Sequence, residues 1–463
     1  MKQFIQRHIV LLGIVFIGAL AGLGFVACTS DDDMLNRLDE KVTADSNPRL
    51  RTEAEAIEIA IGNLGMIDRA VPRSRAASDI VADVSVIGSK VKSRNGATND
   101  TLLYAVNFKN NEGFALVPAS RKADPLLAIC EKGNYSSGCE KLNPGFGIYM
   151  GLAEKKLADL EKISDDQNSN TGNDGYEIDF NLNPIETDPN RIAQEMKETE
   201  DTTWYCRVMP RVKVQWNQDD FYGELAPNHV AGCWPIAIAQ AMTYLRYPEY
   251  MQFTFSEREI NDLHIDWDEI NCHKHKYDCN CFIHRAFDNH KHISHIIRQI
   301  GEDAGSDYRK PNSTGTDKRY AWEFLYKYGF DITPTRTYTK GCSKEIGNNL
   351  IFIRGRNGDG DGHVWILDGV KKYKVTHKCS YRRNNNTEWE VMSEQVYNFH
   401  FNHFNWGWGG HCDGWFNDMV FDALSPVEPN NTHTDTSYFN QDTGYDDYDF
   451  VTDMEYIIVG KPK

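Results

Sequence analysis

Hydrophobic and polar positions divide the chain into two folded regions separated by a polar stretch. Within residues 49–162 the apolar residues recur with helical spacing in two places and with strand-like spacing in three. The predicted elements are a helix at 53–60, strands at 102–108, 114–117 and 126–129, and a helix at 148–160. We therefore predict a compact α+β unit at 49–162.

Residues 163–203 have a different character. Serine, aspartate, asparagine and glycine dominate their first part, and acidic residues return near position 200. A segment with so little to bury is expected to stay solvated, and exposed segments of this kind are where proteases cut. Aromatic density rises from Trp204 onward, which predicts a second, larger domain at 204–463.

The first 27 residues have the order of an export signal. Lys2 and Arg7 precede an uncharged apolar run at 9–27, which is long enough to be an uncleaved anchor as well. The ending at 25–28 resembles a lipoprotein signal-peptidase box, and the acidic run after Cys28 resembles a surface-export signal. We expect a lipid on Cys28, a flexible tether at 28–48, and a protein anchored in the cell envelope at the outer-membrane surface.

Composition and charge narrow the function classes. The 463 residues carry 67 Asp plus Glu against 50 Lys plus Arg, a net charge of −17, which argues against nucleic-acid binding. A mean hydropathy of −0.56 excludes a polytopic membrane protein. Eleven cysteines in an exported chain predict disulfides by default, with pairings that the sequence leaves open.

Cys233 is the strongest candidate nucleophile. It follows Gly232 and precedes Pro235 at the start of an alanine-rich apolar segment that ends near Leu245. Proline fits the first turn of a helix, so Cys233 is predicted at a helix N-terminus, where the helix dipole lowers a thiol pKa. The alternative is a buried structural cysteine or one half of a disulfide.

A thiolate nucleophile needs a base, and the base needs a group that orients it. His363 follows a glycine-rich turn and opens an apolar strand, so it can face a cleft, although a half-exposed loop histidine is the plainer alternative. Asn405 offers an amide that could fix the imidazole tautomer, and Trp406 would shield that hydrogen bond from water. The order Cys, His, Asn is that of papain-like peptidases.

These segments together resemble the streptopain-type cysteine peptidase family. The resemblance covers most of residues 50–463, in motifs at 232–248, 362–369, 403–416 and 456–460, and at 104–107, 113–117 and 125–129 in the N-terminal unit. It implies that Gln218 supplies an oxyanion N–H and that 49–162 is an inhibitory propeptide. Trp234 to Ile236 replace small residues usual in the family, which predicts a narrowed or reshaped cleft.

The resemblance implies a papain-like α+β peptidase domain at 204–463 and an endopeptidase made as a zymogen, activated by cutting within 163–203. Protein or peptide substrates, the chain's own propeptide and the membrane are the expected partners, and no cofactor is expected. Cutting would release the mature enzyme from the lipid on Cys28. The alternatives are a catalytically silent binding protein on this fold and an acyl-transfer enzyme using the same residues.

A Cys/His-rich stretch has no counterpart in the family pattern. Its weak candidate zinc ligands are Cys272, His275, Cys279, Cys281 and His284, but their irregular spacing favours disulfides or a surface loop. The loop at 357–362 resembles a calcium loop but lacks the bidentate glutamate that an EF-hand needs. We therefore predict no metal site.

Overall fold

The computed structural model describes residues 49–68, 77–88, 101–136, 139, 143–162, 194–219, 221–254, 260–271, 290–339, 341–356, 362–383, 388–421 and 452–462. These residues form two compact units that interleave along the chain. The first unit takes its residues from Met1–Ile129, Leu157–Cys206 and Lys372–Phe399. The second takes Cys130–Lys156, Arg207–Lys371 and His400–Lys463.

The first unit is built on an antiparallel meander with a helix against it. Its elements are α2 (Glu53–Gly62), η3 (Leu64–Ile67), α3 (Ala77–Ile80), β1 (Val81–Gly88), β2 (Thr101–Phe108), η4 (Lys109–Asn111) and β3 (Phe114–Pro118). Strand β2 pairs with both β1 and β3. The predicted helix at 53–60 and the strands at 102–108 and 114–117 are therefore confirmed.

Local polar contacts fix the start of α2. The side chain of Thr52 accepts from the backbone N–H of Glu55, and the Glu55 carboxylate accepts from the backbone N–H of Thr52 at 2.8 Å. This capping box satisfies two N–H groups that a helix N-terminus leaves free. The buried guanidinium of Arg51 donates to the carbonyls of Pro118 and Ala123, which ties the helix to the end of β3.

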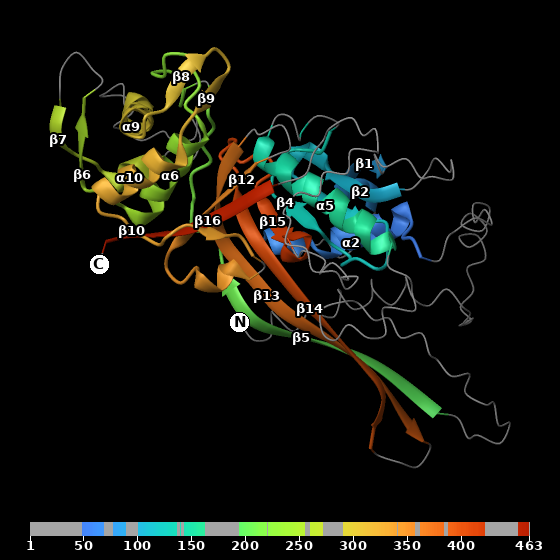
Figure 1. Cartoon of the computed structure of the whole chain (residues 1–463). Coiled ribbons are helices and arrows are strands. Elements are labelled where there is room, and N and C mark those ends of the chain that lie inside the picture. The colour runs from blue at the N-terminus through green and yellow to red at the C-terminus, as the bar shows by residue number, and fades with distance from the viewer. Residues whose placement is uncertain are drawn as a thin grey trace, which may run out of the picture. The chain divides into compact units, whose positions relative to one another are not determined.

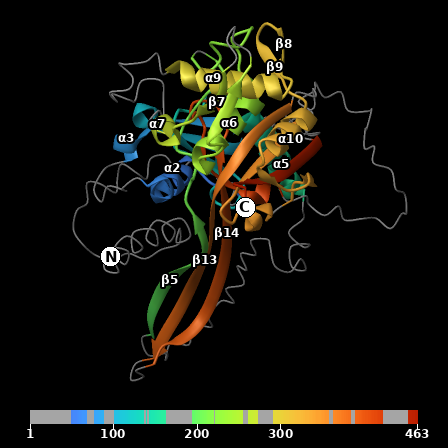
Figure 2. The ribbon, with the colours of Figure 1, turned by 90° about the vertical axis from the view of Figure 1, so that its left-hand side faces the viewer.

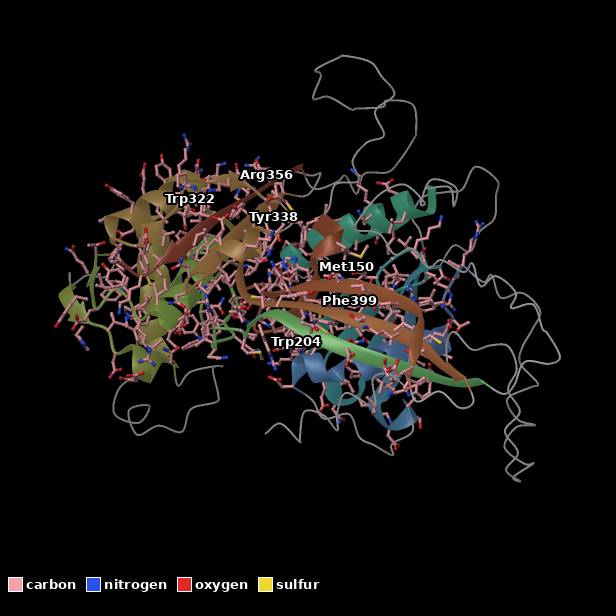
Figure 3. All side chains as sticks on the ribbon, turned by 90° about the horizontal axis from the view of Figure 1, so that it is seen from below. Met150, Trp204, Trp322, Tyr338, Arg356 and Phe399 are labelled. Atoms are coloured by element: carbon pink, nitrogen blue, oxygen red, sulfur yellow. The ribbon has the colours of Figure 1, made fainter. Side chains whose placement is uncertain are left out.

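A long ribbon completes the first unit. Strand β5 (Gln194–Val208) pairs with β13 (Gly362–Arg383), which neighbours β14 (Glu390–Asn405), and Figures 1 and 2 show the three running side by side. Tyr373 packs between Trp204 at 4.8 Å and Phe399 at 5.0 Å between ring centroids; Figure 3 labels the two outer residues.

This ribbon corrects one expectation. Residues 194–203 were expected to stay solvated with the rest of 163–203, but they form most of β5. Backbone pairing with β13 and the aromatic contact at Trp204 hold a strand whose own residues are largely polar, because strand formation depends on a partner more than on propensity. Residues 163–193 lie outside the described part of the chain.

The second unit combines helices with an antiparallel sheet. It includes Cys130, the last residue of β4 (Ala128–Cys130), and most of α5 (Pro144–Lys162). Its other elements are α6 (Cys233–Leu245), β6 (Tyr250–Phe253), β7 (Ile260–His264), α7 (Trp267–Asn271), α9 (His290–Asp303), β8 (Asp307–Lys310), β9 (Ser313–Gly315), α10 (Lys318–Lys327), β10 (Asp331–Ile332), β11 (Arg336–Thr337), η6 (Cys342–Glu345), β12 (Leu350–Arg356), β15 (Gly414–Asn417), η7 (Asp418–Phe421) and β16 (Thr452–Gly460).

Helix α6 lies at the centre of the helical part of this unit. Every side chain in it is buried except those of Cys233 and Tyr244, which are half-buried. It packs on α9, and Figure 1 shows α6, α9 and α10 gathered together. Its alanines allow this close packing, as the sequence predicted. A helix buried on all sides is held by its hydrophobic surroundings rather than by its own propensity.

The sheet brings the C-terminal motifs together. Within the second unit its order is β15-β14-β13-β12-β16-β10, and the pairs β14–β15, β12–β13 and β12–β16 are antiparallel. The register places Gly355 opposite His363 and His403 opposite Trp415. Strand β16 confirms the predicted last strand at 456–460.

The mixed α and β character matches the predicted fold class. The second predicted helix, at 148–160, is α5, which starts four residues earlier at Pro144. The predicted domain boundaries at 27, 48, 162 and 203 stay predictions, and the export signal and tether lie outside the described residues. Among the described residues no helix is both long enough and apolar enough to span a bilayer.

Candidate active site

Cys233 is the first residue of α6, as the sequence predicted. The preceding Gly232 has a φ of 94°, a conformation that L side chains rarely adopt. A Cβ on Gly232 would also lie 3.0 Å from the Cγ2 methyl of Thr314, so glycine is needed for both backbone shape and space. The thiol of Cys233 accepts from the backbone N–H groups of Val364 and Trp234.

The protonation of this thiol differs from the expectation. Burial raises the pKa of Cys233, and the N–H groups of Val364 and Trp234 together with the charge of Arg354 only partly offset that rise. A helix N-terminus alone was expected to lower the pKa. In this structure desolvation outweighs the helix dipole, so Cys233 is held as a thiol.

The side chain of Trp234, which was expected to narrow or reshape the cleft, is buried. Its indole is 3% exposed and packs edge-on against Trp322 at 4.7 Å between ring centroids. Phe352 of β12 lies on another side at 6.4 Å. The large residue after Cys233 therefore fills the core between α6, α10 and the sheet.

His363 is the second residue of β13 and only 3% exposed. Its Nε2 lies 3.0 Å from the carbonyl oxygen of Trp406, so Nε2 carries the hydrogen and donates it. Burial lowers the pKa of His363 to about 4, which leaves the imidazole neutral at pH 7 with Nδ1 unprotonated. His363 makes no hydrogen bond to Cys233, although the next residue, Val364, contacts the thiol.

Asn405, the last residue of β14, is bound elsewhere. Its Oδ1 accepts from Gln240 Nε2 at 3.1 Å and from the backbone N–H of Gly407 at 3.0 Å. Its Nδ2 donates to Gln240 Oε1 at 3.3 Å. Asn405 therefore pairs with an amide from α6 and does not contact the His363 imidazole, which the sequence had assigned to it.

Trp406 links these groups. It is fully buried, its indole Nε1 donates to the carbonyl of Cys412, and its backbone N–H donates to Asp413 at 2.9 Å. Burial raises the pKa of Asp413 to about 7, against the stabilising N–H of Trp406. The backbone carbonyl of Trp406 is thereby fixed and accepts the hydrogen bond from His363. The predicted role of Trp406 was different, because its indole was expected to shield a hydrogen bond between His363 and Asn405.

Gln218 is bonded to the segment that directly precedes Cys233. Its carbonyl accepts from the backbone N–H of Ala231 at 2.6 Å, two residues before Cys233, and its side chain is 8% exposed. The neighbouring Trp216 donates its backbone N–H to Gln240 on α6. Both bonds anchor this loop beside the start of the helix, which is where an oxyanion donor has to stand.

A segment from the predicted propeptide packs on the same residues. We name residues 130–156, which belong to the second unit, the covering segment. A Cβ on its Gly145 would stand 2.6 Å from Trp406 Cε3 and 2.7 Å from His363 Cδ2. Only glycine allows the backbone of α5 to approach the imidazole this closely, so the covering segment seals His363 from solvent.

Further contacts hold the covering segment in place. Asn143 donates to the carbonyl of His411 at 3.2 Å, and the backbone N–H of Glu131 donates to Asp413 at 2.8 Å. The thiols of Cys139 and Cys412 hydrogen-bond each other. All of these partners belong to the loop that follows Trp406, so one short loop receives the covering segment and positions the imidazole.

A second buried histidine lies near this loop. His403 Nδ1 is 2.6 Å from Asp368 Oδ1, and its Nε2 is 3.4 Å from Glu131. Burial alone would lower its pKa, but Asp368 and Glu131 raise the pKa of His403 to about 10. Asp368 also accepts the backbone N–H groups of Arg211 and Val212, so this carboxylate is fully bonded.

The predicted metal and disulfide sites can be compared with the structure only in part, because several of their residues lie outside the described ranges. The candidate zinc ligands Cys272, His275, Cys279, Cys281 and His284 lie outside the described residues, as does most of the loop at 357–362. No group of three or more ligating side chains within the described ranges could hold a metal ion. The cysteines described there are free thiols, so the default expectation of disulfides is wrong for them.

A cysteine at a helix N-terminus, beside an antiparallel sheet that carries histidine and asparagine, defines a cysteine-type peptidase of papain-like design. Residues 216–416 match the sequence profile of the Peptidase C10 family. The matched range contains Cys233, His363 and Asn405.

Curated proteins and a solved structure are also similar to this chain. Streptopain of Streptococcus pyogenes serotype M28 (strain MGAS6180) is 22% identical over 435 residues, which cover 90% of this chain and 93% of streptopain. Streptopain of serotype M3 (strain SSI-1) gives the same values. A prointerpain A fragment from Prevotella intermedia superposes with a TM-score of 0.46 and 17% identity, covering 79% of this chain and 98% of that one.

Sequence reasoning missed three residues that shape the site. Gln240 is a buried amide in an otherwise apolar helix, and such a group needs a partner, so its polarity was a usable signal. Asp413 and Gly145 gave no comparable signal. Asp413 matters because it accepts the backbone N–H of Trp406, and Gly145 matters because it lies against the ring of His363, which is distant in the chain.

Proposed function

We propose that this chain is a cysteine endopeptidase, made as a zymogen, in which Cys233 attacks the peptide carbonyl. His363 takes the thiol proton and returns it to the leaving amine. Water then hydrolyses the acyl-enzyme. The observation that carries the proposal is the contact of the Cys233 thiol with the N–H of Val364, because Val364 directly follows His363.

The imidazole must turn before this chemistry begins. In the covered state Nε2–H is engaged by the Trp406 carbonyl and the ring is buried beneath Gly145. Departure of the covering segment would let the ring leave that carbonyl and reach Cys233. Water at the ring would then return the pKa of His363 toward its ordinary value. The Cys233 backbone N–H and the Gln218 amide would hold the oxyanion.

Asn405 would orient the turned imidazole only if its amide becomes available to Nδ1 or Nε2. Its pairing with Gln240 already fixes the amide plane at the end of β14. This arrangement supports a role for Asn405 as the orienting group and for Gln240 as its support. Trp406, already rigid between Phe404 and Phe416, would exclude water from that contact.

The test is peptide-bond hydrolysis by the full chain after limited proteolysis. Processed wild type should digest casein, whereas Cys233→Ala and His363→Ala should each lose about 10⁴-fold or more in kcat/KM. Cys206→Ala serves as the matched control, because Cys206 is another half-buried free thiol. Product analysis with an added amine separates hydrolysis from acyl transfer. Equal activity of Cys233→Ala and wild type would refute the proposal.

Two glycines of α5 give a matched test of autoinhibition. Gly145 lies against His363, whereas Gly151 has free space around it. A Cβ on Gly151 would meet nothing within 4 Å. Gly145→Ala should force the covering segment away from His363, at a cost of about 1–3 kcal/mol. Uncut Gly145→Ala should hydrolyse peptides about ten- to a hundredfold faster than uncut wild type. Gly151→Ala should behave as wild type.

The proposed location is the cell envelope, with a lipid on Cys28 and the mature enzyme released once the segment at 163–203 is cut. The export-signal order of residues 1–27 and the acidic run after Cys28 support this proposal. Mass spectrometry of membrane fractions should find the lipid on the N-terminal fragment and lose it in Cys28→Ser. A lipid on the mature peptidase fragment would contradict the release step.

A further inference from the structure

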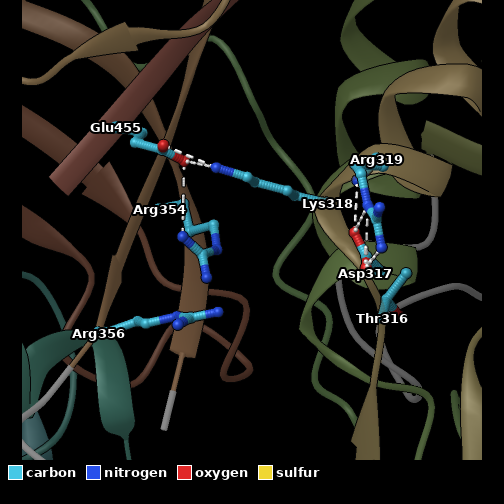
Figure 4. Close-up of a pocket in the computed structure, with 7 residues that line it drawn as sticks. All are labelled: Thr316, Asp317, Lys318, Arg319, Arg354, Arg356 and Glu455. Atoms are coloured by element: carbon cyan, nitrogen blue, oxygen red, sulfur yellow. Dashed lines mark hydrogen bonds and ion pairs between the residues drawn. The ribbon is translucent and has the colours of Figure 1, made fainter. Parts of the chain in front are cut away.

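A polar pocket of about 290 Å³ lies in the second unit, between the start of α10 and the strands β12 and β16. Figure 4 shows the side chains that line it, with Lys318 and Arg319 on one wall and Arg354, Arg356 and Glu455 on the other. Four of the lining side chains are cationic and two are anionic. This local excess of positive charge contrasts with the net charge of −17 of the whole chain.

Both carboxylates of the pocket are already paired. Asp317 caps α10 through the Arg319 backbone N–H at 2.9 Å, and it binds the Arg319 guanidinium at 2.7 Å. That contact lowers the pKa of Asp317 to about 2. Glu455 accepts from Lys318 Nζ at 2.6 and 2.7 Å. Both carboxylates are therefore bonded to cations, and neither is free to neutralise the rest of the pocket.

Arg356 is the cation left over. Its side chain is exposed, and among the described residues it makes no ion pair. Arg354, which lines the same wall, already lies 3.5 Å from Glu455. A guanidinium without a carboxylate partner in a walled pocket can bind a carboxylate through two parallel N–H donors.

The pocket adjoins the catalytic residues. Arg356 lies opposite Gly362 in the β12–β13 register, and the next pair is Gly355 with His363. Arg354 faces Val364, whose N–H contacts the Cys233 thiol, and the charge of Arg354 acts on that thiol. The loop that forms the other wall begins beside Thr314, which packs on Gly232. A peptide bond placed at Cys233 therefore brings its flanking side chains within reach of this pocket.

We propose that this pocket is a substrate subsite in which Arg356 binds the carboxylate of an aspartate or glutamate side chain near the scissile bond. The inference rests on the proposed peptidase function and adds a preference for acidic residues. Lys318 and Arg319, through their pairs with Glu455 and Asp317, shape the pocket and keep it positively charged.

The test uses matched peptides that differ only in glutamate against glutamine, placed in turn at each position flanking the scissile bond. Processed wild type should cleave one glutamate peptide at least about fivefold faster in kcat/KM than its glutamine partner. Arg356→Gln should bring that ratio close to one. Arg356→Glu should reverse the preference in favour of a lysine peptide.

Arg309→Gln is the control, because it removes one exposed cation from the same unit but outside the pocket. It should keep the wild-type ratio. A ratio of one at every position in wild type, with glutamine peptides still cleaved, would overturn the subsite and leave the peptidase function standing. An equal loss of ratio in Arg309→Gln would reduce the effect to general charge and also overturn the subsite.

Binding separates failure of the pocket from failure of the enzyme. Fluorescence anisotropy on processed Cys233→Ala should show tighter binding of the glutamate peptide than of the glutamine peptide, with the difference lost in Cys233→Ala/Arg356→Gln. This result would support the subsite even if neither peptide were hydrolysed. If inorganic phosphate at constant ionic strength blocked both peptides equally, the pocket would be a free-anion site and the inference would be wrong.

Discussion

The surroundings of His363 and His403 differ although the two side chains are almost equally buried, at 3% and 4% exposure. Among the residues that the structure describes, the hydrogen-bond partner of His363 is a backbone carbonyl, and burial lowers the pKa of His363 to about 4. His403 lies between Asp368 and Glu131, which raise its pKa to about 10 despite burial. Burial therefore does not decide the charge of an imidazole. The charge of its partners decides it.

The comparison also separates two functions. His403 is a permanently charged structural group whose Nδ1 is paired closely with Asp368 and whose Nε2 has a longer ion pair with Glu131. His363 is neutral, weakly held and sealed by a glycine of the covering segment. A catalytic base has to change its charge and position during the reaction, and only His363 is bound loosely enough to do so.

The largest expected effect is on activity. His363→Ala should lower kcat/KM of the processed enzyme by about 10⁴-fold or more, because no base remains for the thiol. The free energy of unfolding should stay within about 1 kcal/mol of wild type, since one carbonyl bond is lost at a site where a charged imidazole is disfavoured. Peptide hydrolysis and urea unfolding measure the two quantities. A large stability loss with retained activity would reverse the roles that we assign to the two histidines.

The next effect is on stability. Asp368→Ala and His403→Ala should each lower the free energy of unfolding by about 3–5 kcal/mol, because each leaves a buried charge without its partner. His264→Ala is the control, since its ion pair with Glu249 is long, at 3.9 Å, and exposed. Urea unfolding followed by tryptophan fluorescence at pH 7 gives all three values. Losses near zero for the first two variants would show that the His403 pair is not ionic.

The pH dependence of stability should have opposite signs at the two sites. The folded pKa of His363 lies below its unfolded value, so the unfolded chain binds more protons between about pH 4 and 6.5. Stability should therefore rise with pH across that window, by up to about 3 kcal/mol. Subtracting the curve of Cys233→Ala/His363→Asn from that of Cys233→Ala isolates this contribution. A difference curve that is flat or falls from pH 4 to 6.5 would contradict it.

The contribution of His403 has the reverse sign because its folded pKa is raised. It is fully present below about pH 6.5 and is lost as the pH rises toward 10.

The smallest predicted change concerns Glu131, the weaker partner of His403. Glu131→Gln should cost only about 0.5–1 kcal/mol and should slightly lower the pKa of His403, because this ion pair is long and partly exposed. Histidine NMR titration measures that shift, and an unchanged pKa would remove Glu131 from the account.

The sequence predicted the elements that carry the site better than the contacts between them. The helix start at Cys233 and the strand after His363 both follow from local glycine, proline and apolar patterns. The partners of those side chains did not follow. Asn405 binds Gln240, 165 positions away, and local patterns do not specify a contact of that range.

The state of the site was also beyond sequence reasoning. The pKa of Cys233 is raised because the folded chain desolvates the thiol, and His363 is turned to Trp406 because Gly145 covers it. Strand β5 is a similar case, because its polar residues form a strand by pairing with β13. In each case a distant segment decided the outcome.

The most direct test of the covered state is the pKa of His363 itself, measured by NMR in Cys233→Ala before and after the linker is cut and the covering segment removed. The account predicts a pKa near 4 in the uncut chain, with the hydrogen on Nε2, and a rise toward 6.5 afterwards. An imidazole that titrates near 6.5 in the uncut chain, or that keeps the same pKa in both forms, would contradict it.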